Sequence, residues 1–333
     1  MNWRTVSFVS ALVVLLGGVG YYVLTFNTVA PTEEKMFVIG VITNPTSLDP
    51  ALRGFQDGMR ARGYEEGRNI RYLIEPGGGK IESAKVVAER LVAEGIDALY
   101  VMGSVAGRAA KEVTAAKNPT LPVVFGVISN PVGSKLVASI QSSGNNLTGI
   151  TPNNENLSTK RLEVFLTMIP EIKRVIMAWS DPNTSGIENL RRAAQALHVE
   201  LVEQQIVDAD ATKSFYASFP YEKGDVIFRA TDAASGTIVK DLIAISLEKK
   251  IPLSGTNVSD VESGAIMSYG ANYEKIGEQA ARLMDAILHG TKPSELPIEL
   301  PETIEFIISA KTAVLLGLTI PDAVLLQANR IIQ

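Results

Sequence analysis

Short apolar runs alternate with longer helical patterns from Met36 almost to the end of the chain, and this alternation constrains the fold most strongly. The run 36–43 is nearly continuous in apolar residues, as expected of a strand covered on both faces of a parallel sheet. Asp49-Pro50 then predicts a helix, with Asp as N-cap and Pro at the first helical position, and Gly63 predicts its end. Regular strand–helix alternation predicts βαβ units, right-handed crossovers and mainly parallel sheets.

The same alternation occurs twice along the 333 residues. A turn at Asn130-Pro131 is also expected to open a short helix, ahead of a strand over 147–150 that crosses into the second set. The remaining expected strands are 70–75, 98–102, 122–125, 175–179, 199–207, 226–230, 251–253 and 265–269. The expected helices are 81–94, 106–117, 158–168, 187–197, 212–219, 237–249 and 273–288. Two such sets in one chain predict two α/β lobes of ordinary domain size.

The N-terminus carries an uncharged apolar stretch over 6–26, between Arg4 and Glu33-Glu34. Its length is close to that needed to span a hydrocarbon core and exceeds the apolar region of an ordinary signal peptide. The flanking charges favour an N-terminus inside the cell and a body outside it. We therefore interpret residues 1–32 as a membrane anchor or a signal peptide, favouring the anchor, with an extracytoplasmic body.

Composition excludes several classes of chemistry. The chain has no cysteine, which removes disulfides, thiolate nucleophiles and cysteine metal sites. The net charge of −5 gives no basic patch and argues against nucleic acid as a partner. The run Gly77-Gly78-Gly79-Lys80 lacks the spacing of a P-loop, and no pattern of a catalytic triad or a metal site is visible. The sequence therefore predicts no enzyme activity, no cofactor and no metal.

The stretch Leu121–Pro152, LPVVFGVISNPVGSKLVASIQSSGNNLTGITP, carries a family resemblance. It resembles the DPVG-x-x-LV … PGGN-x-TG segment of ABC-transporter substrate-binding proteins of the TrpX-like family, which includes tryptophan- and tyrosine-binding members. The tail Ile304–Leu325, IEFIISAKTAVLLGLTIPDAVL, resembles the family's closing strand, NLKTA helix and LGLTIP turn. The resemblance extends from about Met36 to the C-terminus.

The resemblance implies the type I periplasmic binding protein fold, which has two doubly wound parallel-sheet lobes joined by a three-strand hinge. Mapped onto this chain, the crossings fall near 149–152, 266–269 and 297–302. The first lobe then comprises residues 33–149 plus 268–298. The second lobe comprises residues 150–267 plus 299–333.

Ligands of open α/β sheets bind beyond the carboxyl ends of the strands, which selects the loops after each strand independently of any family. These loops are rich in Ser, Thr, Asn and Asp and poor in Lys and Arg, which suits a small zwitterion better than a phosphorylated ligand. The candidate ligand-binding residues are Asn44, Ser47, Ser104, Ser129, Asn130, Asn183, Ser185, Asp232 and Asn257.

Three of these candidates have specific expected roles. Ser104 and the first amides of its helix could hold a carboxylate, with plain helix capping as the alternative. Asp232 is the candidate partner of an ammonium group, again with capping as the alternative. Asn130 stands where the family more often has Asp, so it acts either as a turn acceptor or as a mark of a different ligand. For an aromatic ligand, the candidate clamps are Trp179, Phe125, Tyr269 and Tyr273, each of which also fits a core position.

The function expected from sequence is that of the extracytoplasmic solute-binding component of an ABC uptake transporter. The resemblance implies a body that closes on a small amino acid-like ligand, aromatic ligands included, and docks on a membrane permease as a monomer. An anchored ligand sensor of the same fold remains an alternative, as does a two-domain α/β enzyme. A repressor of the same fold would need a helix-turn-helix where this chain has its apolar segment.

Overall fold

The computed structural model describes residues 35–43, 48–180, 186–206 and 208–333. The predicted N-terminal apolar helix therefore lies outside the described residues. Within the described ranges, no helix is both long and apolar enough to cross a bilayer.

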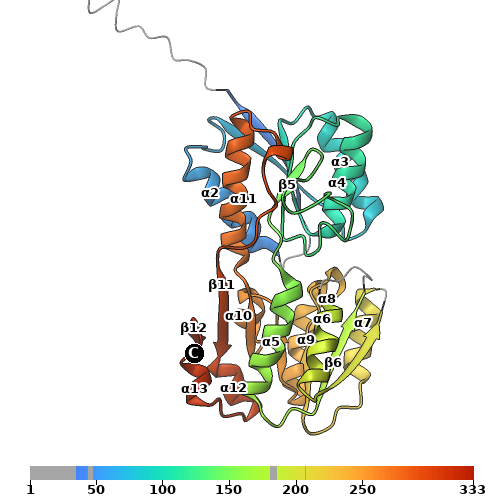
Figure 1. Cartoon of the computed structure of the whole chain (residues 1–333), viewed down its shortest axis with the longest axis vertical. Coiled ribbons are helices and arrows are strands. Elements are labelled where there is room, and N and C mark those ends of the chain that lie inside the picture. Colours follow the sequence, from blue (N-terminus) through green and yellow to red (C-terminus); the bar gives the residue numbers. More distant parts are fainter. Residues whose placement is uncertain (1–34, 44–47, 181–185, 207) are drawn as a thin grey trace, which may run out of the picture. The chain divides into compact units, whose positions relative to one another are not determined.

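The first sheet consists of five parallel strands in the order β2-β1-β3-β4-β5. Figure 1 labels its last strand, β5, and the helices α2, α3, α4 and α11 beside it. The strands are β1 (Phe37–Thr43), β2 (Ile70–Pro76), β3 (Ala98–Met102), β4 (Val123–Gly126) and β5 (Leu147–Gly149). Helices α2 (Asp49–Arg60) and α11 (Tyr273–Leu288) cover one face, and α3 (Ile81–Ala93) and α4 (Ser104–Lys117) cover the other. Along β1, Ile39 packs with α2 and α11 whereas Ile42 packs with α3 and α4, which explains the strand's continuous apolar run.

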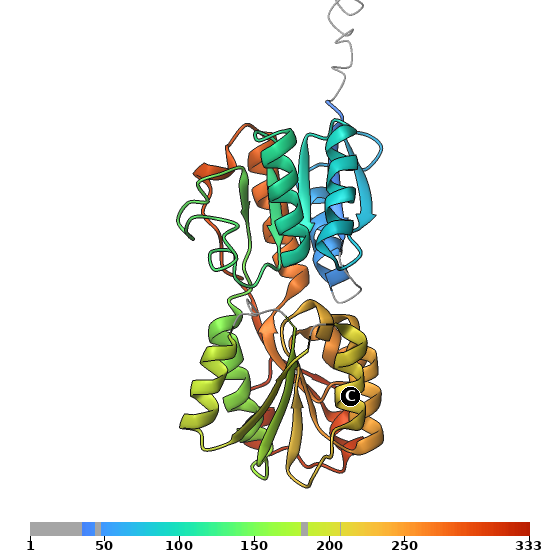
Figure 2. The ribbon, with the colours of Figure 1, turned by 90° about the vertical axis from the view of Figure 1, so that its right-hand side faces the viewer.

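The second sheet has seven strands in the order β12-β11-β10-β9-β8-β6-β7 (Figure 2). They are β6 (Arg174–Trp179), β7 (Glu200–Gln205), β8 (Asp225–Phe228), β9 (Leu253–Gly255), β10 (Met267–Ala271), β11 (Ile304–Ser309) and β12 (Arg330–Ile332). Strands β10 and β11 pair antiparallel, and the other pairings of this sheet are parallel. The mainly parallel α/β architecture predicted from the sequence is therefore confirmed.

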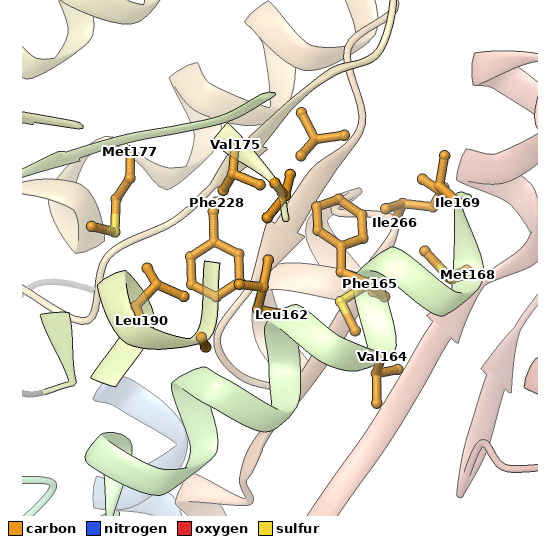
Figure 3. Close-up of a cluster of buried hydrophobic side chains, with 14 of the residues drawn as sticks. Leu162, Val164, Phe165, Met168, Ile169, Val175, Met177, Leu190, Phe228 and Ile266 are labelled. Carbon is orange, nitrogen blue, oxygen red and sulfur yellow. The ribbon is translucent and has the colours of Figure 1, made fainter. Parts of the chain in front are cut away.

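Helices also cover both faces of the second sheet. One face carries α5 (Asn154–Met168), α6 (Ile187–Ala196), α12 (Ala310–Leu316) and α13 (Asp322–Leu325). The other carries α7 (Ala209–Ser218) and α9 (Val239–Lys249). Figure 3 shows Leu162 and Phe165 of α5 in the first of these cores, with Val175 and Phe228 of the sheet. The short helices α8 (Ala233–Thr237) and α10 (Val258–Ser263) follow β8 and β9, and the 3-10 helix η2 (Pro293–Glu295) follows α11.

The two sheets share one topology. Numbered in order of appearance, the first sheet reads 2-1-3-4-5, and the segment β7-β6-β8-β9-β10 of the second reads the same way. In both, the strand order reverses between the first and third strands, which creates a topological switch point.

Backbone hydrogen bonds join the three segments that link the sheets. Glu299 accepts from the amide of Thr151 at 2.9 Å and donates to the carbonyl of Gly149 at 2.9 Å. The amide of Asn272 donates to the carbonyl of Thr303 at 3.1 Å. Strand β10 remains in the second sheet to Ala271, slightly beyond the expected crossing at 266–269. The lobe limits drawn from the sequence stay a prediction.

Several local expectations differ from the structure. Asp49 is the first residue of α2 and not its N-cap, which is Leu48. The short helix after Asn130-Pro131 is wrong: the segment forms successive turns, with Lys135 in the left-handed region at φ 56°. Helix α5 begins at Asn154, four residues before the predicted start. Helices α8 and α10 were not predicted, because six or fewer residues provide too little periodicity.

Candidate ligand site at the strand ends

The topology places two switch points, one in each sheet, and switch points are where open α/β sheets bind ligands. In the first sheet the switch point lies between β1 and β3, so the loops after these strands border it. Candidates Asn44 and Ser47, after β1, lie outside the described residues. Candidates Asn183 and Ser185, which follow β6 at the second switch point, also lie outside them.

Ser104 is the first residue of α4, directly after β3, and thus borders the first switch point. The N-cap is Gly103, whose φ of 81° suits glycine, so Ser104 is not the capping residue. The half-buried hydroxyl of Ser104 has no hydrogen-bond partner among the described residues. The first-turn amides of this 14-residue helix offer the polarity that suits a carboxylate.

Ser129 and Asn130 follow β4, away from the switch point, and both contribute to local structure. The Ser129 hydroxyl accepts from Asn154 Nδ2 at 2.8 Å, and its carbonyl accepts from the Thr151 hydroxyl at 3.3 Å. Asn130 Oδ1 accepts from the amide of Gly133 at 2.7 Å. Asn130 therefore acts as the turn acceptor, the first of the two roles expected for it.

Asp232 connects the two loops of the second switch point. One carboxylate oxygen accepts from the amide of Ser235 at 2.9 Å and caps α8. The other accepts from the amide of Ser180, just after β6, at 2.6 Å. The capping alternative is thus realised, yet each carboxylate oxygen retains capacity for a further donor.

Asn257 follows β9 and is buried. Its Oδ1 caps α10 by accepting from the amide of Asp260 at 3.3 Å, and its Nδ2 donates to the Thr256 hydroxyl at 3.2 Å. Among the candidates that the structure describes it is the most enclosed, at 3% exposure. Its contacts give it a structural role at the end of β9.

A buried charge cluster, which the sequence interpretation missed, lies at the ends of β8 and β9. Arg229 pairs with Asp260 at 2.8 Å, and Asp260 also accepts from the amide of Thr256 at 2.7 Å. Arg161 of α5 donates to the carbonyl of Arg229 at 2.8 Å and to that of Gly255 at 3.1 Å. These contacts hold three charged side chains in the interior of the second lobe.

Arg161 has no carboxylate partner among the described residues. Its guanidinium lies 3.9 Å from the ring centroid of Phe228, a cation–π contact that compensates only part of its charge. Burial, followed by repulsion from Arg229, lowers the pKa of Arg161 to about 9. A polar stripe on α5, Asn154, Ser158 and Arg161, spaced four and then three residues apart, was the sequence signal for this position.

Three buried polar side-chain atoms of the described residues lack a hydrogen-bond partner. Within the described part of the chain they are Arg161 Nε, Thr231 Oγ1 and Ser235 Oγ. Thr231 and Ser235 both belong to the segment that follows β8, and Arg161 bonds the carbonyl two residues before Thr231. Because buried polar groups are normally satisfied, these three atoms call for an explanation.

The aromatic candidates have mixed surroundings. Phe125 is fully buried in a core cluster, and Tyr273 is buried beside Thr256 and Asn257, where burial raises the pKa of its phenol. Trp179, half-buried at the end of β6, donates from its indole to Glu203 at 3.1 Å. Trp179 and Tyr269 are both half-buried, so they are the two aromatic candidates that are not fully enclosed in a core.

A hollow of about 470 Å³ lies away from both switch points, between α2, α11 and residues 302–303. Its lining is strongly charged, with Arg62, Lys275 and Arg282 beside Asp57, Glu278 and Glu302. Within the described ranges, no group of three or more His, Asp or Glu side chains is arranged to hold a metal ion.

Two α/β halves of one topology, each with polar loops at its switch point, define the class of two-lobed ligand-binding folds. The family model for ABC transporter substrate binding proteins matches residues 35–332. This chain therefore belongs to the ABC transporter substrate-binding protein family. Because that family consists of binding proteins, the chain is a binding protein and not an enzyme.

One curated protein and two solved structures are similar to this chain. A curated tyrosine-binding protein of Clostridioides difficile strain R20291 is 25% identical over 284 residues, covering 84% of this chain and 80% of that protein. A conserved domain protein of Vibrio cholerae has a solved structure with a TM-score of 0.80, 28% identity and coverage of 90% and 99% of the two chains. An ABC domain from Streptococcus pneumonia, solved with L-Trp, has a TM-score of 0.80 at 23% identity, covering 90% of this chain and all of that one.

Proposed function

We propose that this protein is the solute-binding component of an ABC uptake transporter and binds an amino acid-like ligand between its two lobes. The observation that carries the proposal is the repeated topology, which gives each sheet one switch point bordered by Ser, Thr, Asn and Asp side chains. The relative named for tyrosine and the fold neighbour solved with L-Trp support an aromatic amino acid.

In this proposal the two lobes share the recognition of the ligand. The first contributes Ser104 and the α4 amides, and the candidates Asn44, Ser47, Ser129 and Asn130 follow β1 and β4 in the sequence. The second contributes Asp232 for the ammonium group, with Asn183, Ser185 and Asn257 on adjoining loops. Rotation about the three linking segments closes the lobes and buries the ligand, as in hinge-closing binding proteins.

The transport role rests on the family, whose members serve ABC transporters. We propose an extracytoplasmic body, tethered by the apolar N-terminal segment 6–26 and docked on a membrane permease. The same tether would also fit a ligand sensor, which is the second candidate function. Pull-down of the closed, ligand-loaded protein from membranes distinguishes the two functions. Recovery of the permease with it supports the transport role, and recovery without the permease supports the sensor.

The direct test is calorimetric titration of the purified full-length protein, in mild detergent because of its apolar segment. L-tryptophan, L-tyrosine, aliphatic amino acids, sugars and nucleosides are titrated separately. A ligand that binds only the folded state also raises the melting temperature with its concentration. Saturable binding of an aromatic amino acid supports the proposal, whereas saturable binding of only a sugar or nucleoside contradicts the ligand class.

A further inference from the structure

The unpartnered hydroxyls that follow β8 indicate which group of the ligand binds there. Thr231 Oγ1 and Ser235 Oγ are buried hydroxyls with no partner among the described residues, so each can donate a hydrogen bond that the protein itself does not use. Leaving such groups unsatisfied costs free energy, so a bound acceptor at this place would recover that cost.

The charges around these hydroxyls favour an anionic acceptor. Arg161 reaches the carbonyl of Arg229, two residues before Thr231, and is 2% exposed with no carboxylate partner in the described chain. Arg229 is already neutralised by Asp260 at 2.8 Å. Asp260 also attracts Arg161, but two buried arginines share this one carboxylate, so the interior here keeps an excess of positive charge.

Asp232 lies between Thr231 and Ser235 in the sequence and provides the carboxylate of this loop. It ties Ser180 to Ser235 and keeps acceptor capacity for an ammonium group. In an α-amino acid the ammonium and carboxylate groups are attached to one carbon, so their binding groups must be close neighbours. The loop after β8 offers an acceptor for one and donors for the other within five residues.

We propose that the hydroxyls of Thr231 and Ser235, and not Ser104 and the α4 amides, bind the carboxylate of the ligand, and that the buried charge of Arg161 makes this position selective for an anion. The proposal rests on the proposed function, because it assumes an amino acid ligand at the second switch point. In this proposal Arg161 is a positioning residue. Its positive charge favours an anion at the end of β8, and its hydrogen bonds hold the carbonyls of Arg229 and Gly255.

The test compares L-tyrosine with tyramine, which lacks the carboxylate, on the full-length protein and its variants. Thr231→Val and Ser235→Ala are each expected to weaken L-tyrosine binding by about tenfold to a hundredfold, the effect of one hydrogen bond to a charged group. Their tyramine affinity should hardly change, so the ratio of the two affinities should fall. L-tryptophan and tryptamine replace this pair if L-tryptophan is the ligand found.

The folded state provides an independent readout. Because neither hydroxyl has a protein partner, both variants should keep or raise the melting temperature of the ligand-free protein. Ser246→Ala is the matched control, since its buried hydroxyl donates to the carbonyl of Ile251 at 2.6 Å, away from β8. That variant should melt earlier and bind L-tyrosine as the wild type does.

Arg161 is tested by rescue. Arg161→Met should lower the ratio of L-tyrosine to tyramine affinity, and Arg161→Lys, which keeps the charge, should restore part of it. An unchanged ratio in Thr231→Val and Ser235→Ala would overturn this inference while leaving amino acid binding intact. If the wild type bound no amino acid at all, the proposed function would itself fail.

Discussion

At the scale of single residues, the interior of the second lobe holds more charge than its core of aliphatic side chains requires. Arg161, Arg229 and Asp260 are each at most 3% exposed, and Asp260 is the one carboxylate bonded to this group in the described structure. It accepts bonds from the guanidinium of Arg229, from the amide of Thr256 and from the hydroxyl of Thr256. Asp260 is therefore the residue on which the charge balance depends.

Asp260→Ala should lower the free energy of unfolding by about 3–5 kcal/mol, because it leaves buried arginines without a counter-charge. Urea denaturation at pH 7 measures the change. Lys160→Ala is the control, since Lys160 pairs with Glu163 at 3.1 Å on the surface and should cost less than about 1 kcal/mol. Equal effects of the two substitutions would contradict the role assigned to Asp260.

The buried tyrosines predict a loss of stability at alkaline pH. Burial is the main cause of a raised pKa at Tyr64, Tyr72, Tyr100, Tyr216, Tyr221 and Tyr273. In the unfolded chain these phenols ionise near pH 10, whereas in the native state they keep their protons. Their contribution is therefore complete below pH 10 and is lost as pH rises further.

Tyr100→Phe isolates one of these groups, because Tyr100 is fully buried and donates only a long hydrogen bond, 3.4 Å, to the carbonyl of Ala51. The variant should unfold much like the wild type at pH 7 and lose less stability between pH 10 and pH 11. Arg161 acts in the opposite direction above pH 9, because its lowered pKa makes the native state bind fewer protons there. Identical pH profiles for wild type and variant would refute the prediction.

At the scale of secondary-structure elements, α2 and α11 pack through glycines. A side chain at Gly277 of α11 would fall on the carbonyl oxygen of Ala51, and one at Gly54 of α2 on that of Glu274. The two helices come from opposite ends of the sequence and lie side by side (Figure 1). Their close approach packs α11, which follows the second crossing, against the first sheet.

Gly277→Ala should lower the melting temperature, because a methyl group there meets backbone that cannot move away. Overpacking of this kind costs about 1–3 kcal/mol or more, against a gain of about 1 kcal/mol in helix propensity. Gly107→Ala on α4 is the control: its methyl group would meet the end of the Ile128 side chain, which can change rotamer. Thermal unfolding should show the larger loss in Gly277→Ala, and a larger loss in Gly107→Ala would oppose the packing argument.

Among the elements, the long periodic ones were predicted well. Helix α11 spans the predicted residues 273–288, and β3 the predicted 98–102. Both have sufficient length or an unbroken apolar run to show their period. The turns after Asn130 were mistaken for a helix because an Asn-Pro pair marks a helix start and a turn equally well.

At the scale of the whole molecule, the closure proposed above depends on how the three linking segments are held. Gln279 of α11 donates to the carbonyl of Leu300 at 3.1 Å and accepts from the amide of Glu302 at 3.0 Å. It is 6% exposed, so these backbone groups have no ready substitute in solvent. Gln279 thereby fixes the third linking segment to α11, the helix that follows the second linking segment.

Gln279→Ala should increase hydrogen exchange at the amide of Glu302 and lower the free energy of unfolding by about 1–3 kcal/mol, the cost of unsatisfied buried groups. Exchange measured by NMR or mass spectrometry locates the change. Lys275→Ala, one turn earlier and exposed, is the control and should leave the Glu302 amide protected. Unchanged exchange in Gln279→Ala would show that Gln279 does not hold this segment.

The sequence by itself determined the α/β class, the parallel sheets and the polar character of the strand-end loops, since all three follow from local periodicity and composition. It also selected the Asp232 loop as a candidate ligand loop, because that loop follows a strand, and this assignment stays a prediction. It could not identify Arg161 or the unpartnered hydroxyls of Thr231 and Ser235, whose burial depends on contacts between α5, β8 and β9. Only the tertiary structure decided which polar residues lost their access to water, because burial arises from elements distant in sequence.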